Sequence, residues 1–336
     1  MGGYAALQDW DAITPFGENV SITQHPLQIR FCEHASDPVL SAGNIVTALA
    51  YMRGDVKKSD LKIRYKLNRD ELMASRNSTQ GIAGWQSDMS LVGSVALAVD
   101  EEPEKGAWSF NTLPGNPIIF KSEGFQTVSS EKVPGEMMVR GDDAIKMMKK
   151  EGRLSNANRS IPSQGIFESS TGELLLKAKE EFMQINTPRL QGVCSKGGAT
   201  GDLKDVEILA QSERGNIVVA SRDKLKPIAE AKRLLVCYIT DAQNSGIKFA
   251  NAKGSRVVSL GDPKTNVVLL KTGSFEVKIH NKNAVKMKAW AVAANGERYL
   301  KFGEKNVKVD GEYITLSVDT DKMQYGPTFY FELNVE

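Results

Sequence analysis

The sequence is poor in the two residue types that most often build metal centres and disulfide frameworks. Its 336 residues include only three cysteines and three histidines. Cys32, Cys194 and Cys237 are far apart in the sequence, and no two of them have the spacing of zinc ligands. We therefore expect no disulfide framework, no metal site and no cofactor.

Long apolar runs and an excess of one charge are also lacking. No run approaches the ~20 residues needed to span a bilayer, and the first residues, MGGYAALQDW, do not have the charged and apolar regions of a signal peptide. Lys and Arg number 43 against 41 Asp and Glu, which gives a formal net charge of +2 with the two signs interspersed. We expect neither nucleic acid nor a membrane as a partner.

The clearest helix signal lies in residues 37–52, DPVLSAGNIVTALAYM. Asp37 or Ser36 is suited to cap the N-terminus, Pro38 fits the first turn, and apolar residues recur at helical spacing. A second helix is predicted at 142–150, where Asp142 and Asp143 suit a helix start. Residues 61–67, LKIRYKL, alternate between apolar and polar side chains and predict a half-buried strand, and 117–121 is a further strand candidate.

The C-terminal half reads as a succession of short strands. Residues 173–179 and 181–187 are two strand-like runs one residue apart, which predict either a sharp corner or one bent strand. Further strands are predicted at 206–211, 216–222, 233–240, 266–271, 274–280, 286–293, 313–318 and 328–335, many separated by Gly, Asn or Asp turns. The sequence thus predicts a mainly β fold with some α, ending in an antiparallel β-sandwich at 168–336.

Two parts of the sequence resemble a known family. YAALQDWDAI at 4–13, an extended stretch to Arg30 and Phe31, then Asp37-Pro38 and a helix ending in RGD at 53–55, resemble the last barrel segment of bacterial clan A glycoside hydrolases. FMQINTPRLQGV at 182–193 and IVVASRDKLKPIAEAKRLLV at 217–236 are similar to the β-sandwich that follows that barrel. The resemblance implies that 1–57 are the last strand and helix of a (β/α)8 barrel and that 58–336 are a β-rich accessory region.

The same resemblance implies what the chain does. The family hydrolyses O-glycosidic bonds with two carboxyl groups, which come from the fourth and seventh barrel strands. Because the matched segment begins at about the eighth strand, no catalytic carboxylate is expected in this chain. We expect the non-catalytic C-terminal portion of a glycoside hydrolase, with an upstream barrel segment of the same enzyme and a carbohydrate as its partners.

Four residues are candidates for binding sugar. Trp10 corresponds, by the resemblance, to the aromatic at the end of the eighth strand beside the sugar subsite, and an indole can both stack on a pyranose and donate a hydrogen bond. Gln8 and Asp9 are its polar neighbours, as is Asp11. A packed Trp10, and a cap or turn role for Asp9 and Asp11, are the alternatives.

Trp290 is the fourth candidate, in the predicted strand KMKAWAV. Met287, Ala289 and Ala291 share one face of that strand, and Trp290 lies on the other face with lysines. An aromatic on a polar face is suited to glycan stacking or to docking on a neighbouring domain, whereas cross-strand packing is its commoner use.

Two other functions are compatible with the residues. The chain is alternatively a stand-alone carbohydrate-binding or structural β-sandwich protein, in which residues 1–57 are an embellishment. A third alternative is an enzyme of unrelated chemistry housed in residues 69–165, a region without His or Cys, which limits general-base and thiol chemistry there.

Overall fold

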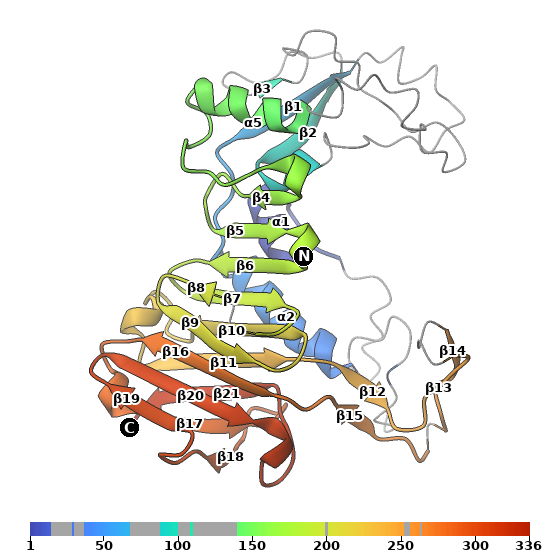
Figure 1. The fold of residues 1–336 in the computed structure, drawn as a ribbon, viewed down its shortest axis with the longest axis vertical. Helices are drawn as coiled ribbons and strands as arrows, with labels where there is room; N and C mark the ends of the chain where they lie inside the picture. The colour runs from blue at the N-terminus through green and yellow to red at the C-terminus, as the bar shows by residue number, and fades with distance from the viewer. Residues whose placement is uncertain are drawn as a thin grey trace. The chain divides into compact units, whose positions relative to one another are not determined.

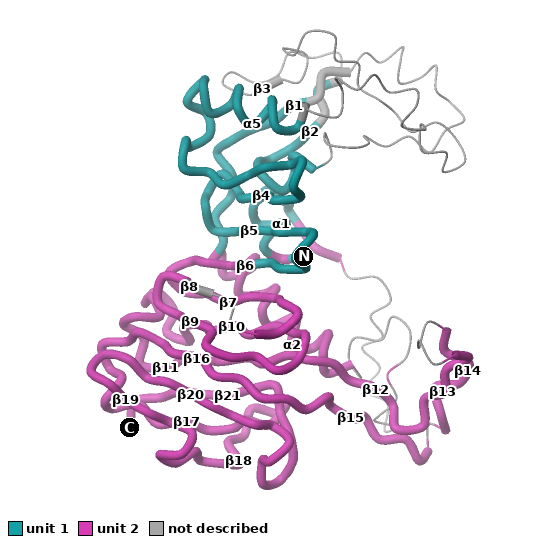
Figure 2. Tube along the Cα trace, viewed as in Figure 1, with its two compact units in different colours: residues 1, 3–11, 56–183 teal, residues 2, 12–55, 184–336 magenta. Residues whose placement is uncertain are grey.

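The structure is a computed structural model that describes residues 1–14, 29, 37–67, 88–99, 108–109, 140–198, 201–251, 256–262 and 264–336. These residues belong to two compact units, coloured separately in Figure 2. Unit 1 comprises residues 1, 3–11 and 56–183, and unit 2 comprises residues 2, 12–55 and 184–336. The division differs from the predicted one at residue 57, because residues 12–55 group with the C-terminal strands.

Unit 2 contains two antiparallel sheets (Figure 1). The larger sheet includes, within unit 2, the strands β7 (Leu190–Ser195), β10 (Gly215–Ser221), β11 (Arg233–Ile239), β17 (Met287–Val292), β18 (Arg298–Lys301) and β21 (Tyr330–Val335), in the spatial order β18-β17-β21-β11-β10-β7. The strands of the smaller sheet are β8 (Gly201–Asp202), β9 (Val206–Gln211), β16 (Ser274–His280), β19 (Val307–Asp310) and β20 (Tyr313–Asp319), in the order β19-β20-β16-β9-β8. The predicted mainly β fold with some α is confirmed.

Aromatic side chains from the two sheets meet in the core of unit 2. Phe275 of β16 lies 4.9 Å from Tyr238 of β11 and 5.1 Å from Phe331 of β21, measured between ring centroids. Along β16, Phe275, Val277 and Ile279 are buried while the residues between them are partly or fully exposed. This alternation directs one face of each strand inward, so the two sheets form a sandwich.

Short elements complete unit 2. Two small ribbons are formed by β12 (Ala242–Asn244) with β15 (Val268–Leu270) and by β13 (Lys248–Phe249) with β14 (Val257–Ser259). Single 3-10 turns lie at η6 (Ile228–Glu230), η7 (Ala284–Lys286) and η8 (Thr320–Lys322). The side-chain amide of the buried Asn244, in β12, accepts a hydrogen bond from the backbone N–H of Ile29 (2.8 Å) and donates one to the Ile29 carbonyl (3.0 Å). These two bonds hold the backbone of Ile29 against β12.

The predicted helix at 37–52 is present as α2 (Pro38–Ala50). Oδ1 of Asp37 accepts hydrogen bonds from the backbone N–H groups of Val39 (2.8 Å) and Leu40 (3.2 Å), so Asp37 is the N-cap of the two residues expected for that role. Only Ala42 and Ala50 of this apolar helix are buried. Most of its large apolar side chains therefore remain partly or fully exposed.

Unit 1 is smaller and contains a parallel sheet. Strand β1 (Lys62–Leu67), predicted from its alternation, lies between β2 (Ser94–Val99) and β3 (Trp108–Ser109). Its other elements are α1 (Gly2–Gln8), η1 (Met89–Leu91), α5 (Arg140–Lys150), η4 (Pro162–Gln164), β4 (Ile166–Glu168), β5 (Leu174–Lys177) and η5 (Ala178–Glu180). A buried cluster that includes Ile63, Met89, Met148 and Phe167 joins β1, η1, α5 and β4 into one core.

The two adjacent strand-like runs are separated by a tight turn. They are β5 and β6 (Phe182–Asn186), with η5 between them, and Glu181 has a left-handed φ of 52°. Of the two predicted alternatives, the structure therefore has the sharp corner between two strands. The chain bends there through the three residues of η5 and the left-handed Glu181. The strand predicted at 117–121 and the extended stretch up to Arg30 and Phe31 lie outside the described residues.

We predict that Phe331→Ala destabilises the protein by ~3–5 kcal/mol, because it removes a fully buried ring between two packed neighbours and leaves a cavity. The measurement is the midpoint of urea unfolding followed by circular dichroism. Val285→Ala, at an exposed position of η7, is the matched control and should change stability little. A loss for Phe331→Ala no larger than that of the control would contradict this account of the core.

Candidate functional site

Gln8, the last residue of α1, makes three hydrogen bonds within unit 1. Its Nε2 donates to the carbonyls of Ser90 and Gly93, each at 2.6 Å, and its Oε1 accepts from the N–H of Val95 at 2.9 Å. Both ends of the amide are thus used to fix the turn between η1 and β2. Gln8 holds the scaffold, and its hydrogen-bonding groups are already occupied.

Asp9 and Trp10 follow the end of α1. Asp9 is the C-cap, with a left-handed φ of 58°, and its Oδ2 lies 3.2 Å from Nζ of Lys58 at an exposed position. Trp10 is 53% exposed, and its backbone N–H donates to the Ala5 carbonyl at 3.1 Å. The resemblance placed Trp10 at the end of a strand, whereas in the structure it follows α1 and its C-cap Asp9, because alanine and leucine at positions 5–7 favour a helix.

Trp290 of β17 lies in unit 2, and its ring is covered. The side chain is on the opposite face from Ala289 and Ala291, as predicted, yet the residue is only 7% exposed. The guanidinium of Arg298 lies 4.0 Å from the ring centroid, and Nζ of Lys301 lies 5.4 Å from it. Both cations make cation–π contacts with the Trp290 ring. A sugar could stack on the ring face that Arg298 covers only if Arg298 moved away.

Asp55, which ends the RGD stretch after α2, is the centre of a buried ion cluster in unit 2. Nε of Arg53 lies 3.0 Å from each carboxylate oxygen, and Nη2 of Arg189 lies 2.8 Å from Oδ1. The same two guanidinium groups also bind backbone carbonyls: Arg53 binds that of Ser221, and Arg189 those of Arg53, Gly54 and Lys224. We call Arg53, Asp55 and Arg189 the Asp55 clamp.

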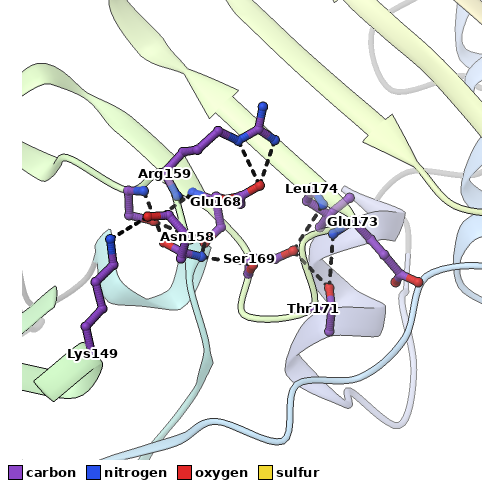
Figure 3. Close-up of polar contacts among 9 residues, drawn as sticks. Lys149, Asn158, Arg159, Glu168, Ser169, Thr171, Glu173 and Leu174 are labelled. Atoms are coloured by element: carbon purple, nitrogen blue, oxygen red, sulfur yellow. Dashed lines mark hydrogen bonds and ion pairs between the residues drawn. The ribbon is translucent and has the colours of Figure 1, made fainter. Parts of the chain in front are cut away.

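A second buried carboxylate organises the loop before β4 in unit 1 (Figure 3). Oε1 of Glu168 accepts hydrogen bonds from Nε (2.9 Å) and Nη2 (2.6 Å) of Arg159, and Oε2 accepts from the Arg159 backbone N–H at 2.6 Å. Asn158 donates to the carbonyls of Glu168 (3.1 Å) and Ser169 (3.3 Å). The carboxylate is therefore a structural acceptor for one arginine.

The remaining buried carboxylates of the described residues are also satisfied. Glu173 accepts from the N–H of Lys57 at 2.7 Å, and Asp205 from Nε2 of Gln191 at 2.9 Å. Glu332, beside Trp290 on the neighbouring strand, is bound by Arg222 and by Nε of Arg298, the latter at 2.6 Å. A general acid or nucleophile must have an oxygen directed at a substrate, whereas these carboxylates are directed at protein donors.

The thiols of the described residues are unsuited to nucleophilic chemistry. Burial raises the pKa of Cys237 to about 12, and burial also raises the pKa of Cys194 above its ordinary value. A thiol needs a lowered pKa to be a thiolate near neutral pH. Both cysteines are free, and Cys32 lies outside the described residues.

Sequence reasoning brought forward Gln8, Asp9, Trp10 and Trp290 but not the carboxylate clusters. Only the RGD stretch at 53–55 was a signal, because it formed part of the family resemblance. The arginine partners of Glu168 and Glu332 come from other turns and strands, and no sequence motif indicates these pairs.

In the part of the chain that the structure describes, no group of three metal-ligating side chains is assembled, and no helix has the length and apolar character to cross a membrane. Comparison of the chain with protein-family models, with curated proteins and with solved structures finds no match.

We predict that Asp55→Asn destabilises the protein by about 3 kcal/mol, since removing one member of a buried ion cluster leaves its partners uncompensated. Urea unfolding at neutral pH measures the loss. The control is Asp310→Asn, which makes the same chemical change at an exposed position. If the two variants have equal midpoints, Asp55 does not hold the α2 segment in place.

Proposed function

We propose that the chain is the non-catalytic C-terminal portion of a glycoside hydrolase, in which α2 completes a (β/α)8 barrel and the sandwich supports it. The observation that supports this most is that an apolar helix with exposed large side chains belongs to the same compact unit as the sandwich strands. Such a helix is unusual on the surface of an isolated domain, and it suits a segment that packs into a larger fold.

Several apolar side chains are exposed on α2 and on neighbouring segments of the chain. Leu40 and Ile45 are exposed on the helix, and Met52, just beyond its end, is 81% exposed. Leu225 adds a further exposed apolar side chain on the loop whose Lys224 carbonyl is bound by Arg189 of the Asp55 clamp. We call Leu40, Ile45, Met52 and Leu225 the α2 surface. Large exposed apolar surfaces commonly mark sites of contact with another element.

The occupant we assign to the α2 surface is the upstream barrel of the same enzyme. In a (β/α)8 barrel the helices form a ring around the strands, so each helix is covered by the strands and by neighbouring helices. Residues 4–13 and 37–55 resemble the last such segment in clan A glycoside hydrolases. The Asp55 clamp would then transmit the position of that last helix to the sandwich.

Hydrolysis in the complete enzyme would depend on carboxyl groups outside this chain. A retaining enzyme needs two carboxyl groups ~5–5.5 Å apart, and the buried carboxylates of the described residues are bound to arginine, amide or backbone donors instead. Trp10 would contribute an exposed indole to the sugar subsite. The enzyme's substrate would be a carbohydrate with an O-glycosidic bond.

A stand-alone carbohydrate-binding sandwich is less well supported. That function would use Trp290 as its sugar platform, and Arg298 lies over that ring at 4.0 Å. It would also leave the α2 surface without a role.

The nucleotide sequence upstream of the first codon tests the proposal. We expect an in-phase reading frame that encodes earlier barrel strands, with a Glu near the end of the presumed seventh strand. A stop codon and a ribosome-binding site directly before the first codon would contradict the proposal and favour a binding function.

We predict further that Ile45→Lys weakens association of residues 1–336 with the separately expressed upstream barrel at least tenfold. A lysine there would have to lose its hydration against an apolar surface, which is unfavourable. The readout is co-purification from a strain that expresses both segments. Val285→Lys, the same change at an exposed position of η7, is the control and should associate like the wild type. Equal association of the two variants would remove the α2 surface from the interface.

A further inference from the structure

Unit 1 contains a shallow pocket that none of the preceding roles uses. Its volume is about 270 Å³, and it is lined by Gln164, Ile166, Lys177, Lys179 and Glu180. The lining comes from η4, β4, β5 and η5, which form a hairpin closed by pairing of Ile166 with Lys177. The volume is near the lower end of ligand pockets, which suits one small molecule.

The charges in the pocket do not cancel. Nζ of Lys177 lies 3.0 Å from the Glu180 carboxylate and 5.6 Å from the ring centroid of Phe182, so this lysine already has an anionic and an aromatic partner. Nζ of Lys179 donates to the neutral carbonyl of Ser163 at 3.2 Å. Lys179 has no carboxylate within ion-pair distance among the described residues, and the pocket therefore has one uncompensated positive charge.

The wall that contains Lys179 is held firmly by the rest of unit 1. The backbone N–H and the hydroxyl of Ser163 donate to the Asp142 carboxylate at 3.0 and 2.6 Å, which fixes η4 to the start of α5. The N–H of Ala178 donates to the carbonyl of Gly165 at 2.9 Å, which draws η5 against η4. A ligand would thus meet a preorganised rim, with little ordering of the backbone required.

We propose that this pocket binds an acidic monosaccharide unit, a pyranose with a carboxylate group. The ammonium of Lys179 would pair with the carboxylate, Gln164 and Glu180 would bind ring hydroxyls as donor and acceptor, and Ile166 would contact the apolar face of the ring. A neutral sugar would leave the charge of Lys179 uncompensated, and a bare anion would leave Ile166 and Gln164 unused. That the ligand is a carbohydrate rests on the proposed function. That it carries a carboxylate is inferred from the charge of Lys179 in the pocket.

Calorimetric titration of the full chain tests the proposal at low ionic strength. The probes are the methyl glycoside of glucuronic acid, methyl glucoside and inorganic phosphate. We expect the glucuronide to bind at least tenfold more tightly than either other probe, a difference of about 1.4 kcal/mol, and its affinity to fall as salt is added. Equal binding of the neutral glucoside, equal binding of phosphate, or no binding of the glucuronide would each overturn the proposal.

The matched variants are Lys179→Gln in the pocket and Lys224→Gln on an exposed loop of unit 2, which remove the same charge. We expect only Lys179→Gln to lower the affinity for the glucuronide, by at least tenfold, with an unchanged circular dichroism spectrum. Equal effects of the two variants would show that overall charge, not this pocket, attracts the ligand. Glucuronide binding with a stop codon directly upstream would refute the proposed hydrolase origin alone, whereas a barrel-encoding frame without glucuronide binding would refute the pocket alone.

Discussion

The arrangement of unit 2 depends on one buried carboxylate. Asp55 has no exposed side-chain surface, and a buried charge is tolerated only with opposite charges and hydrogen bonds around it. Arg53 and Arg189 supply both, and their remaining donors bind backbone carbonyls at the end of α2, at the end of β10 and in the loop that follows β10. One carboxylate thus sets where a helix ends and where two strands of the larger sheet lie with respect to it.

The Asp55 clamp explains why α2, which resembles a helix of a (β/α)8 barrel, belongs to the same compact unit as the sandwich strands. Hydrophobic contact alone would hold α2 weakly, because only Ala42 and Ala50 of the helix are buried. Ionic and backbone hydrogen bonds are directional, so they fix the helix without covering its apolar side chains. The helix therefore leaves Leu40 and Ile45 exposed while its end is held in place.

The amount that could be predicted from the sequence differed between the two units. Strands β9 and β16 were predicted with the observed bounds, since their inward and outward residues alternate and turn residues flank them. Strands β18 and β19 were missed because they are short, largely exposed and rich in charge, so their pattern does not differ from that of a loop. In unit 1 the core joins segments far apart in sequence, such as Ile63 with Met148, and local patterns contain no information about that pairing.

The candidate site residues show the same limit. Alternation placed Trp290 on the correct face of β17, but the cations over its ring come from β18, and sequence spacing does not indicate that cross-strand register. For Trp10, the family pattern suggested a strand, while Gly2–Gln8 form a helix whose end is stabilised by the left-handed Asp9. A side chain's face follows from local periodicity, whereas what covers that face is decided by pairing at a distance.

The buried carboxylates of the described residues bind other groups of the protein and so have structural roles. A buried carboxylate whose oxygens accept hydrogen bonds from arginine, amide or backbone N–H groups of the protein holds the fold in place, and those oxygens are not directed at a substrate. Glu168, Asp205 and Glu332 are of this kind. Two surface features of the described residues differ in type: α2 exposes apolar side chains, and the Lys179 ammonium beside Ile166 is bonded to a neutral carbonyl and not to a carboxylate. The first would suit the protein segment proposed above, and the second would suit the small anionic ligand proposed above, because apolar surface and an ammonium group favour different partners.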